Sequence, residues 1–195
     1  MTPRDWLGLH PSSPQLTFLT PAPQIKSYPD AVYFNYFTLG LSLLFSPQNG
    51  YKPITNLKLH ELEDDNLVLE SIYIYNAPHK DARSNAENAY STYSYLPLAL
   101  VLTAEVKDKD GKPVSRPFKL DVLADSSGKD FVQTLGEPDR KGGGTGPSSG
   151  SIGIWCEWTR DGIMVEFGGD EARGPQAWER GKDAIWKIIT IFPPT

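Results

Sequence analysis

The sequence predicts an α+β fold of mainly antiparallel sheet with short helices, built as two diverged helix-plus-β-meander repeats. Two observations lead to this expectation. Segments rich in aromatic and β-branched residues alternate with turn signals, and the same order of elements occurs twice along the 195 residues. We expect a single domain over 1–195, with repeat 1 at about 12–75, a connecting hairpin at about 76–123 and repeat 2 at about 124–195.

The N-terminal stretch is rich in proline, which removes backbone donors and interrupts regular pairing. At most one helical turn fits there, beginning at the pair Ser12-Ser13 and running to Leu19. From Val32 onward aromatic and branched residues dominate. Residues 32–38 and 41–45 therefore predict two strands joined at Leu39-Gly40.

Further strands are expected in the middle of the chain. Residues 54–62 alternate apolar and polar side chains, which predicts a half-buried strand. Residues 68–75 are apolar on both faces, which predicts a central strand. Residues 98–106 and 116–123 flank a strong turn signal and predict a hairpin. Residues 82–95 show no clear period and predict a loop with room for one helical turn.

The second half follows the same order as the first. Residues 126–135 predict a short, serine-capped helix that ends at Gly136. Residues 155–167 align without a gap with residues 33–45, so that Gly162 falls on Gly40. A late strand completes each copy, at 54–62 in the first and at 184–192 in the second. This shared order predicts an internal duplication.

Composition and charge argue against several classes of function. The net charge of −5, from 24 acidic and 19 basic residues, does not suit a surface that neutralises phosphates. The single cysteine excludes an internal disulfide, and with three histidines it makes no zinc site. No stretch reaches the roughly 20 apolar residues of a membrane span, and no secretory signal is evident. We expect a cytoplasmic protein that binds no nucleic acid and needs no cofactor.

No motif predicts a catalytic or metal-binding site. The glycine-rich run 142–150 lacks the lysine of a nucleotide-binding loop and follows a predicted helix end rather than a strand, which is typical of a linker. The segment 108–111 resembles part of a calcium loop, but the required glutamate is missing. The acidic cluster at 61–65 is typical of a solvated turn, with a hard-cation site as the alternative. Cys156 alternates with Ile154 and Trp158, which predicts a buried thiol with a raised pKa.

The aromatic residues are the most suggestive feature. Core packing is the default for rings on short strands. However, both faces of the two aromatic strands carry large rings, whereas a sheet with one layer of cover buries only one face. Some of these rings are therefore expected to be exposed and to anchor a protein partner or an apolar ligand. Trp186 belongs to the same aromatic set. The candidate interaction residues are Tyr33, Phe34, Tyr36, Phe37, Trp155, Trp158 and Trp178.

Residues 30–45 resemble the phagosome assembly factor 1 family, an uncharacterised-protein family linked to autophagy. Members carry a closely similar aromatic run that ends in Thr-Leu-Gly-x-x-x-Leu-Phe, here Thr38 to Phe45. They also have Leu-Gly-x-Pro segments ahead of such hairpins, as at 135–138. Their histidine- and glycine-containing stretch after the hairpin is not evident in this chain. The resemblance implies a non-enzymatic adaptor that works with a β-propeller partner at phosphoinositide-bearing membranes, to which the partner recruits it.

Three functions follow in order of preference. The first is an interaction protein whose exposed aromatic hairpins bind another protein. The second is a carrier for a small apolar ligand, which predicts a closed cavity of roughly 300 Å³ or more. The third is an enzyme with an unfamiliar site, which predicts converging polar groups with shifted pKa values in a cleft.

Overall fold

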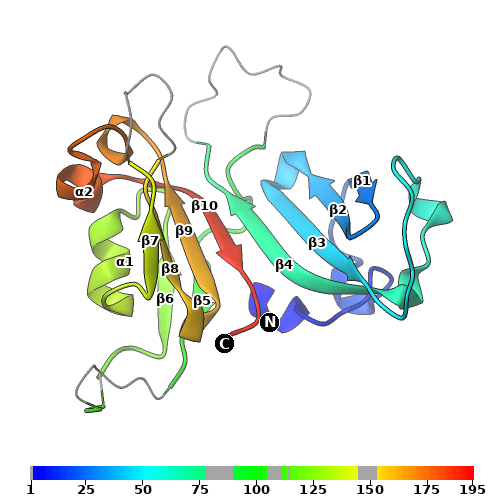
Figure 1. The fold of residues 1–195 in the computed structure, drawn as a ribbon, viewed down its shortest axis with the longest axis horizontal. Coiled ribbons are helices and arrows are strands. Elements are labelled where there is room, and N and C mark those ends of the chain that lie inside the picture. Colours follow the sequence, from blue (N-terminus) through cyan, green and yellow to red (C-terminus); the bar gives the residue numbers. More distant parts are fainter. Residues whose placement is uncertain (1, 78–89, 105–110, 114, 145–152) are drawn as a thin grey trace. The chain divides into compact units, whose positions relative to one another are not determined.

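The computed structural model describes residues 2–77, 90–104, 111–113, 115–144 and 153–195. The chain divides into two compact units, which Figure 1 shows in sequence colours. The first unit contains residues 3–94 and 190–193, and the second contains residues 95–189 together with 194–195. The single domain expected from the sequence stays a prediction, which depends on whether the two units unfold together.

The first unit is an antiparallel ladder in the order β1-β2-β3-β4 (Figure 1). Its strands are β1 Gln24–Tyr28, β2 Ala31–Tyr36, β3 Leu41–Pro47 and β4 Leu67–Tyr75. Its 3-10 turns are η1 Pro3–Trp6, η2 Pro14–Leu16, η3 Phe37–Leu39, η4 Leu59–Glu61 and η5 Asp64–Asn66. The register aligns Phe34 with Leu43 and Leu43 with Ile72, and all three are buried. The alternation of apolar residues along β2 and β3 thus places the core on one face of the ladder.

The turn between β2 and β3 requires a glycine. Tyr36 pairs with Leu41, and η3 fills the connection between them. Gly40 has a φ of 65°, and a Cβ atom there would overlap the carbonyl oxygen of Ser91. Only glycine meets both requirements without strain. The two strands predicted at 32–38 and 41–45 are confirmed, as is their joint at Leu39-Gly40.

The prediction of a strand at 54–62 is wrong. This segment contains only η4, and Ile54 is 69% exposed. The hydroxyl of Ser27 donates to the Ile54 carbonyl oxygen at 2.7 Å and accepts from the Leu57 N–H at 2.8 Å. Backbone groups of this segment are therefore bonded to a side chain on β1 rather than to a neighbouring strand. The late strand of the first unit is β4, which follows this loop.

The strand β1 was not predicted, because its surroundings are rich in proline. Pro23 and Pro29 flank β1 without interrupting it, and its five residues pair with β2 from Gln24 to Tyr28. β4 lies where residues 68–75 predicted a strand, but only one of its faces is fully buried. Tyr73 and Tyr75 on the other face are half-buried. Residues 90–95 form no helix or strand, and the rest of the predicted loop at 82–95 lies outside the described residues.

In its described residues, the second unit combines a four-strand ladder, a two-strand sheet and two short helices. Its strands are β5 Leu98–Val101, β6 Lys119–Val122, β7 Arg140–Gly142, β8 Trp155–Trp158, β9 Ile163–Phe167 and β10 Trp186–Ile191, whose last two residues belong to the first unit. Its helices are α1 Gly128–Leu135 and α2 Ala177–Arg180, and its 3-10 turns are η7 Thr159–Asp161, η8 Asp170–Ala172 and η9 Gly181–Asp183. The larger ladder follows the order β10-β9-β8-β7, and β5 pairs with β6. Mostly antiparallel sheet with short helices confirms the predicted α+β class.

The helix predicted at 126–135 is confirmed as α1. The Asp130 carboxylate accepts hydrogen bonds from the N–H and the hydroxyl of Ser127 at 2.7 and 3.0 Å, which fixes the first turn. The hairpin predicted around residues 107–112 is confirmed through the pairing of β5 with β6, although both strands are shorter than predicted. Most of its turn lies outside the described residues.

The glycine-rich run does not follow a helix end, as the sequence had suggested. β7 precedes it, so the linker connects β7 with β8. β7 has only three residues, Arg-Lys-Gly, and therefore carries no apolar pattern. Residues 145–150 of the run lie outside the described part of the chain. Among the described residues, no helix is long and apolar enough to cross a bilayer.

Candidate functional site

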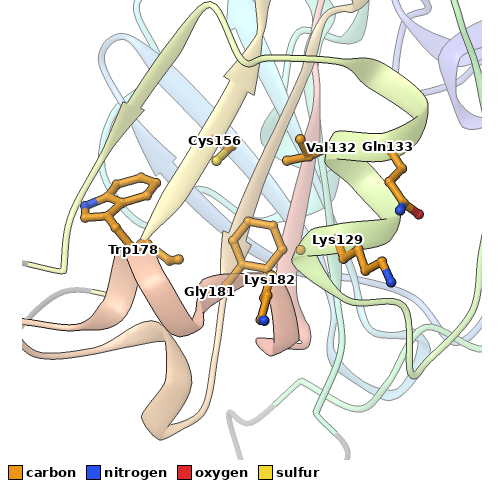
Figure 2. A pocket seen from close by; sticks show the side chains of 10 residues that line it. Lys129, Val132, Gln133, Cys156, Trp178, Gly181 and Lys182 are labelled. Carbon is orange, nitrogen blue, oxygen red and sulfur yellow. The ribbon is translucent and has the colours of Figure 1, made fainter.

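An open apolar groove of about 270 Å³ lies in the second unit between α1 and α2, and we call it the α1–α2 groove (Figure 2). Its lining residues come from α1, α2 and η9 and from the strands behind them. They are Gly128, Lys129, Val132, Gln133, Ile154, Cys156, Phe167, Trp178, Gly181 and Lys182. All ten belong to the second unit, so the groove is complete within it.

Close approach of two glycines sets the distance between the walls. The Gly128 N–H donates to the Ala184 carbonyl oxygen at 2.9 Å. A Cβ atom on Gly128 would overlap the carbonyl oxygen of Gly181, and a Cβ atom on Gly181 would overlap the Ile154 side chain. The first turn of α1 therefore lies directly against η9, with no side chain between the two backbones.

The far end of α1 is held against the sheet. The indole N–H of Trp158 donates to the Gly136 carbonyl oxygen at 3.0 Å, just beyond the helix end. The Phe131 ring packs edge-on against Phe167 with 5.9 Å between ring centroids. Contacts at both ends thus hold α1 against the rest of the unit.

The groove has a buried floor and exposed walls. Ile154, Cys156 and Phe167 are buried and form the floor. Figure 2 shows Val132 and Trp178 on opposite sides of Cys156, one on α1 and the other on α2. Val132 is 37% exposed and Trp178 is 43% exposed, so both present apolar surface to solvent. Exposed apolar walls above an apolar floor are typical of a binding surface.

Cations surround this apolar surface. Lys129 and Lys182 line the groove and are exposed. The ammonium of Lys141 lies 5.5 Å from the centroid of the Trp178 ring, within the range of a cation–π contact. The floor itself is uncharged at neutral pH, because burial raises the pKa of the Cys156 thiol to about 11. The predicted buried thiol with a raised pKa is therefore confirmed.

The described residues bring no histidine and no metal-binding cluster to the groove. Residues 95–189 contain no histidine, so the groove has no imidazole base from its own unit. His10 and His60 belong to the first unit, and His79 lies outside the described residues. No group of three or more His, Cys, Asp or Glu side chains in the described part of the chain is placed to hold a metal ion.

The acidic cluster at 61–65 organises local turns. The Glu61 carboxylate accepts from the Lys58 N–H at 2.7 Å. The Glu63 carboxylate accepts from the Asn66 side-chain amide at 2.8 Å. Both carboxylates therefore stabilise the 3-10 turns of this loop, as expected for a solvated turn.

The seven candidate interaction residues have different environments. Phe34, Tyr36 and Trp158 are buried in the core, so an exposed role for these three is wrong. The alternation of β2 and β8 directs them to the buried face. Partly exposed rings are Tyr33, Phe37 and Trp155, and the exposed one is Trp178. Trp186, of the same aromatic set, is buried. Only Trp178 lies in the groove, and an interaction role for it and the three half-buried rings stays a prediction.

The polar residue in the first aromatic strand has a structural role. Asn35 is buried, and its side-chain oxygen accepts from the Tyr90 hydroxyl at 2.6 Å and from the Ser42 hydroxyl at 2.8 Å. Its side-chain nitrogen donates to the Gln24 carbonyl oxygen at 3.2 Å. The Tyr90 ring stacks on Tyr75 at 3.7 Å between centroids. Asn35 thus joins β1, β2, β3 and residue 90.

Sequence reasoning did not identify Val132, Lys129 or Lys182 as site residues. One feature of the sequence could have identified Val132. It is an apolar residue beside the buried face that Phe131 and Leu135 define in a predicted amphipathic helix. Lys129 and Lys182 are ordinary surface lysines in sequence. They gain significance only from the approach of α1 to η9.

No protein-family model, no curated protein and no solved structure matches this chain.

Proposed function

We propose that this chain is a non-enzymatic interaction protein that binds a protein partner through the α1–α2 groove. The observation that carries the proposal is the pair of exposed apolar walls, Val132 and Trp178, above the buried floor around Cys156. Tryptophan is enriched among residues that dominate binding energy at protein interfaces. An exposed tryptophan beside a preformed apolar depression therefore favours a protein-binding role.

The alternatives receive less support from the same groove. A carrier is expected to enclose most of its ligand in a cavity of roughly 300 Å³ or more. The groove is smaller, at about 270 Å³, and it is open along exposed residues. An enzyme needs an activated group, but the Cys156 thiol is protonated at neutral pH and has no histidine in its unit. A partner protein is the better candidate.

The family resemblance supplies the rest of the proposal. It favours a cytoplasmic adaptor, linked to autophagy, that a β-propeller partner recruits to phosphoinositide-bearing membranes. Fluorescence imaging of the tagged chain in its own cells, with and without the co-purifying partner, tests this. A location inside a secretory compartment would contradict it.

We also propose that the two units arose by internal duplication. Each unit has a helical turn, two strands, a 3-10 turn, a glycine with left-handed backbone and two further strands, in that order. Gly40 and Gly162 have φ values of 65° and 58° at corresponding places. An experimental structure in which these elements of the two units do not superpose would contradict the duplication.

Affinity capture with the tagged full chain tests the main proposal. The Trp178→Ser variant removes one groove wall, and Phe118→Ser is the matched control because Phe118 is 70% exposed in the same unit but outside the groove. We expect a partner that wild type and Phe118→Ser recover equally and that Trp178→Ser recovers at least about tenfold less. Repeating the comparison with the purified partner establishes direct binding. Equal recovery by all three proteins would show that the groove is not the binding site.

A further inference from the structure

The lysines of the α1–α2 groove are not neutralised by acidic side chains. Lys129 and Lys182 line the groove, and among the described residues neither forms an ion pair. Lys141 is also unpaired there and contacts the Trp178 ring as a cation. Three free ammonium groups around one groove are notable in a chain whose net charge is −5. The lining itself contains two basic residues and no acidic one.

Acidic residues lie close to the groove but outside its lining, and the charge of Glu137 adds to burial in raising the pKa of the Cys156 thiol. No aspartate or glutamate is among the ten lining residues. The Asp130 carboxylate, next to Lys129 in sequence, is directed towards Ser127, from which it accepts two hydrogen bonds. Glu179 on α2 and Asp183 on η9 also lie outside the lining. Lys129 and Lys182, which we call the rim of the groove, are therefore available to a negatively charged occupant.

The centre of the groove requires an apolar group. Val132, Cys156 and Trp178 surround it, and Figure 2 shows the side chain of Cys156 between the other two. Gln133 and the two lining lysines lie at its edge. The occupant therefore combines one large apolar group with acidic groups beside it.

We infer that the α1–α2 groove binds an acidic segment of a partner protein that inserts one large apolar side chain between Val132 and Trp178. This inference rests on the proposed function and names the chemistry of its partner. Carboxylates beside the apolar side chain meet Lys129 and Lys182, and the apolar side chain covers the floor at Cys156. Opposite charges around an apolar anchor give an interface both specificity and a fast association rate.

A peptide segment fits better than a small anionic amphiphile. A small ligand is held by burying most of its surface in a deep cavity. This groove is open, and its walls Val132 and Trp178 stay partly exposed. A side chain on a peptide needs only one face of cover, because the rest of the segment contributes further contacts along the rim.

The test uses the full chain and the indole N–H signal of Trp178 in ¹H–¹⁵N NMR spectra, assigned with Trp178→Phe. The first probe is a short peptide with one Phe flanked by Glu and Asp. The second replaces the acidic residues by Lys, and the third replaces the Phe by Ser. A fourth probe, decanoate, represents an anionic amphiphile. We expect the first peptide to shift the signal, with affinity about tenfold lower for the basic peptide and at least about thirtyfold lower for the serine peptide.

Charge-reversal variants of the protein distinguish a specific role of Lys129 and Lys182 from a general effect of the net charge. The double variant Lys129→Glu, Lys182→Glu is compared with Lys26→Glu, Lys52→Glu, which makes the same charge change on exposed lysines of the first unit. We expect about a tenfold loss of affinity for the acidic peptide in the groove variant only. Equal losses in both double variants would overturn the role of the rim lysines.

The outcomes distinguish this inference from the proposed function. If the basic peptide binds as tightly as the acidic one, or if only decanoate shifts the signal, the inference is wrong. If no probe binds although a captured partner still depends on Trp178, the inference is wrong and the proposed function stands. If no probe binds and no partner depends on Trp178, both are wrong.

Discussion

At the scale of single residues, the second unit contains a buried ion pair between Arg116 and Asp161 and an exposed ion pair between Lys119 and Asp121 among its described residues. Arg116 donates two hydrogen bonds of 2.7 Å to the Asp161 carboxylate, and the two side chains are only 6% and 3% exposed. The same carboxylate accepts from the Thr103 N–H at 2.8 Å. These contacts tie the β5–β6 region to the turn that precedes Gly162, so the pair fixes the hairpin β8–β9.

Replacing Asp161 by Ala is expected to lower the free energy of unfolding by about 3–5 kcal/mol, because the buried Arg116 cation loses its partner. The control is Asp121→Ala, which breaks an ion pair with Lys119 whose side chains are 41% and 48% exposed. That change is expected to cost less than about 1 kcal/mol. Urea unfolding followed by circular dichroism measures both values. Similar losses for the two variants would show that burial of the Asp161 pair contributes nothing extra.

The single cysteine provides a pH-dependent reporter of the groove floor. Burial raises the pKa of the Cys156 thiol from 9.0 to about 11. The folded state therefore holds the thiol proton more tightly than the unfolded state. This contribution to stability is complete below pH 9 and is lost as the pH rises through about 11.

Alkylation of Cys156 by iodoacetamide, followed by mass spectrometry, measures this shift. We expect the rate in native buffer to stay low through pH 9 and to rise towards pH 11, whereas in guanidinium chloride it rises around pH 9. No other cysteine contributes to the signal. Coincident pH profiles in the two solvents would show that the thiol is not shielded in the folded state.

At the scale of elements, the first turn of α1 links the stability of the helix to the shape of the groove. Asp130 accepts from both polar groups of Ser127, and Val132 lies one residue beyond the first turn that this bond fixes. An eight-residue helix is marginal by itself. Its order therefore depends on this cap and on packing against the sheet.

The Asp130→Ala variant is expected to destabilise α1 by about 1 kcal/mol, because two donors of Ser127 lose their acceptor. Amide hydrogen exchange in residues 128–135 is then expected to accelerate by about fivefold, while exchange in β2 and β3 stays unchanged. Asp125→Ala, at an exposed position outside the helix, is the control. Unchanged exchange in α1 would show that packing alone holds its first turn.

Elements with their own local pattern were predictable from the sequence, and elements made by distant contacts were not. The aromatic strands, Gly40 and the capped helix carry recognisable signals in adjacent residues. The loop at 54–57 alternates like a strand, but the Ser27 side chain, far away in sequence, takes its backbone hydrogen bonds. β7 has three residues and no apolar member, so its pairing with β8 is visible only in the fold.

The candidate site was predictable only in part for the same reason. Trp178 was among the aromatic residues expected to anchor a partner. The opposite wall, Val132, depends on how α1 is oriented, and that orientation depends on the contact between Gly128 and Gly181. These two glycines are separated by more than fifty residues of sequence. The sequence pattern around either one does not reveal that the other lies against it.

At the scale of the whole molecule, β10 raises the question of how many cooperative units the chain contains. Ile189 belongs to the second unit and Ile191 to the first, although they are two residues apart on one strand. Both are buried, with exposures of 0% and 2%. One strand therefore contributes a core residue to each unit.

The variants Ile189→Ala and Ile191→Ala form a matched pair that separates one cooperative unit from two. Each removes the same atoms from a core, at an expected cost of about 2–5 kcal/mol. If the units unfold independently, Ile191→Ala accelerates hydrogen exchange in β2, β3 and β4, and Ile189→Ala accelerates it in α1, β8 and β9. We expect equal acceleration throughout the chain in both variants, because β10 contributes residues to both units and the sequence predicts a single domain over residues 1–195. The selective pattern would instead show that the two units unfold independently.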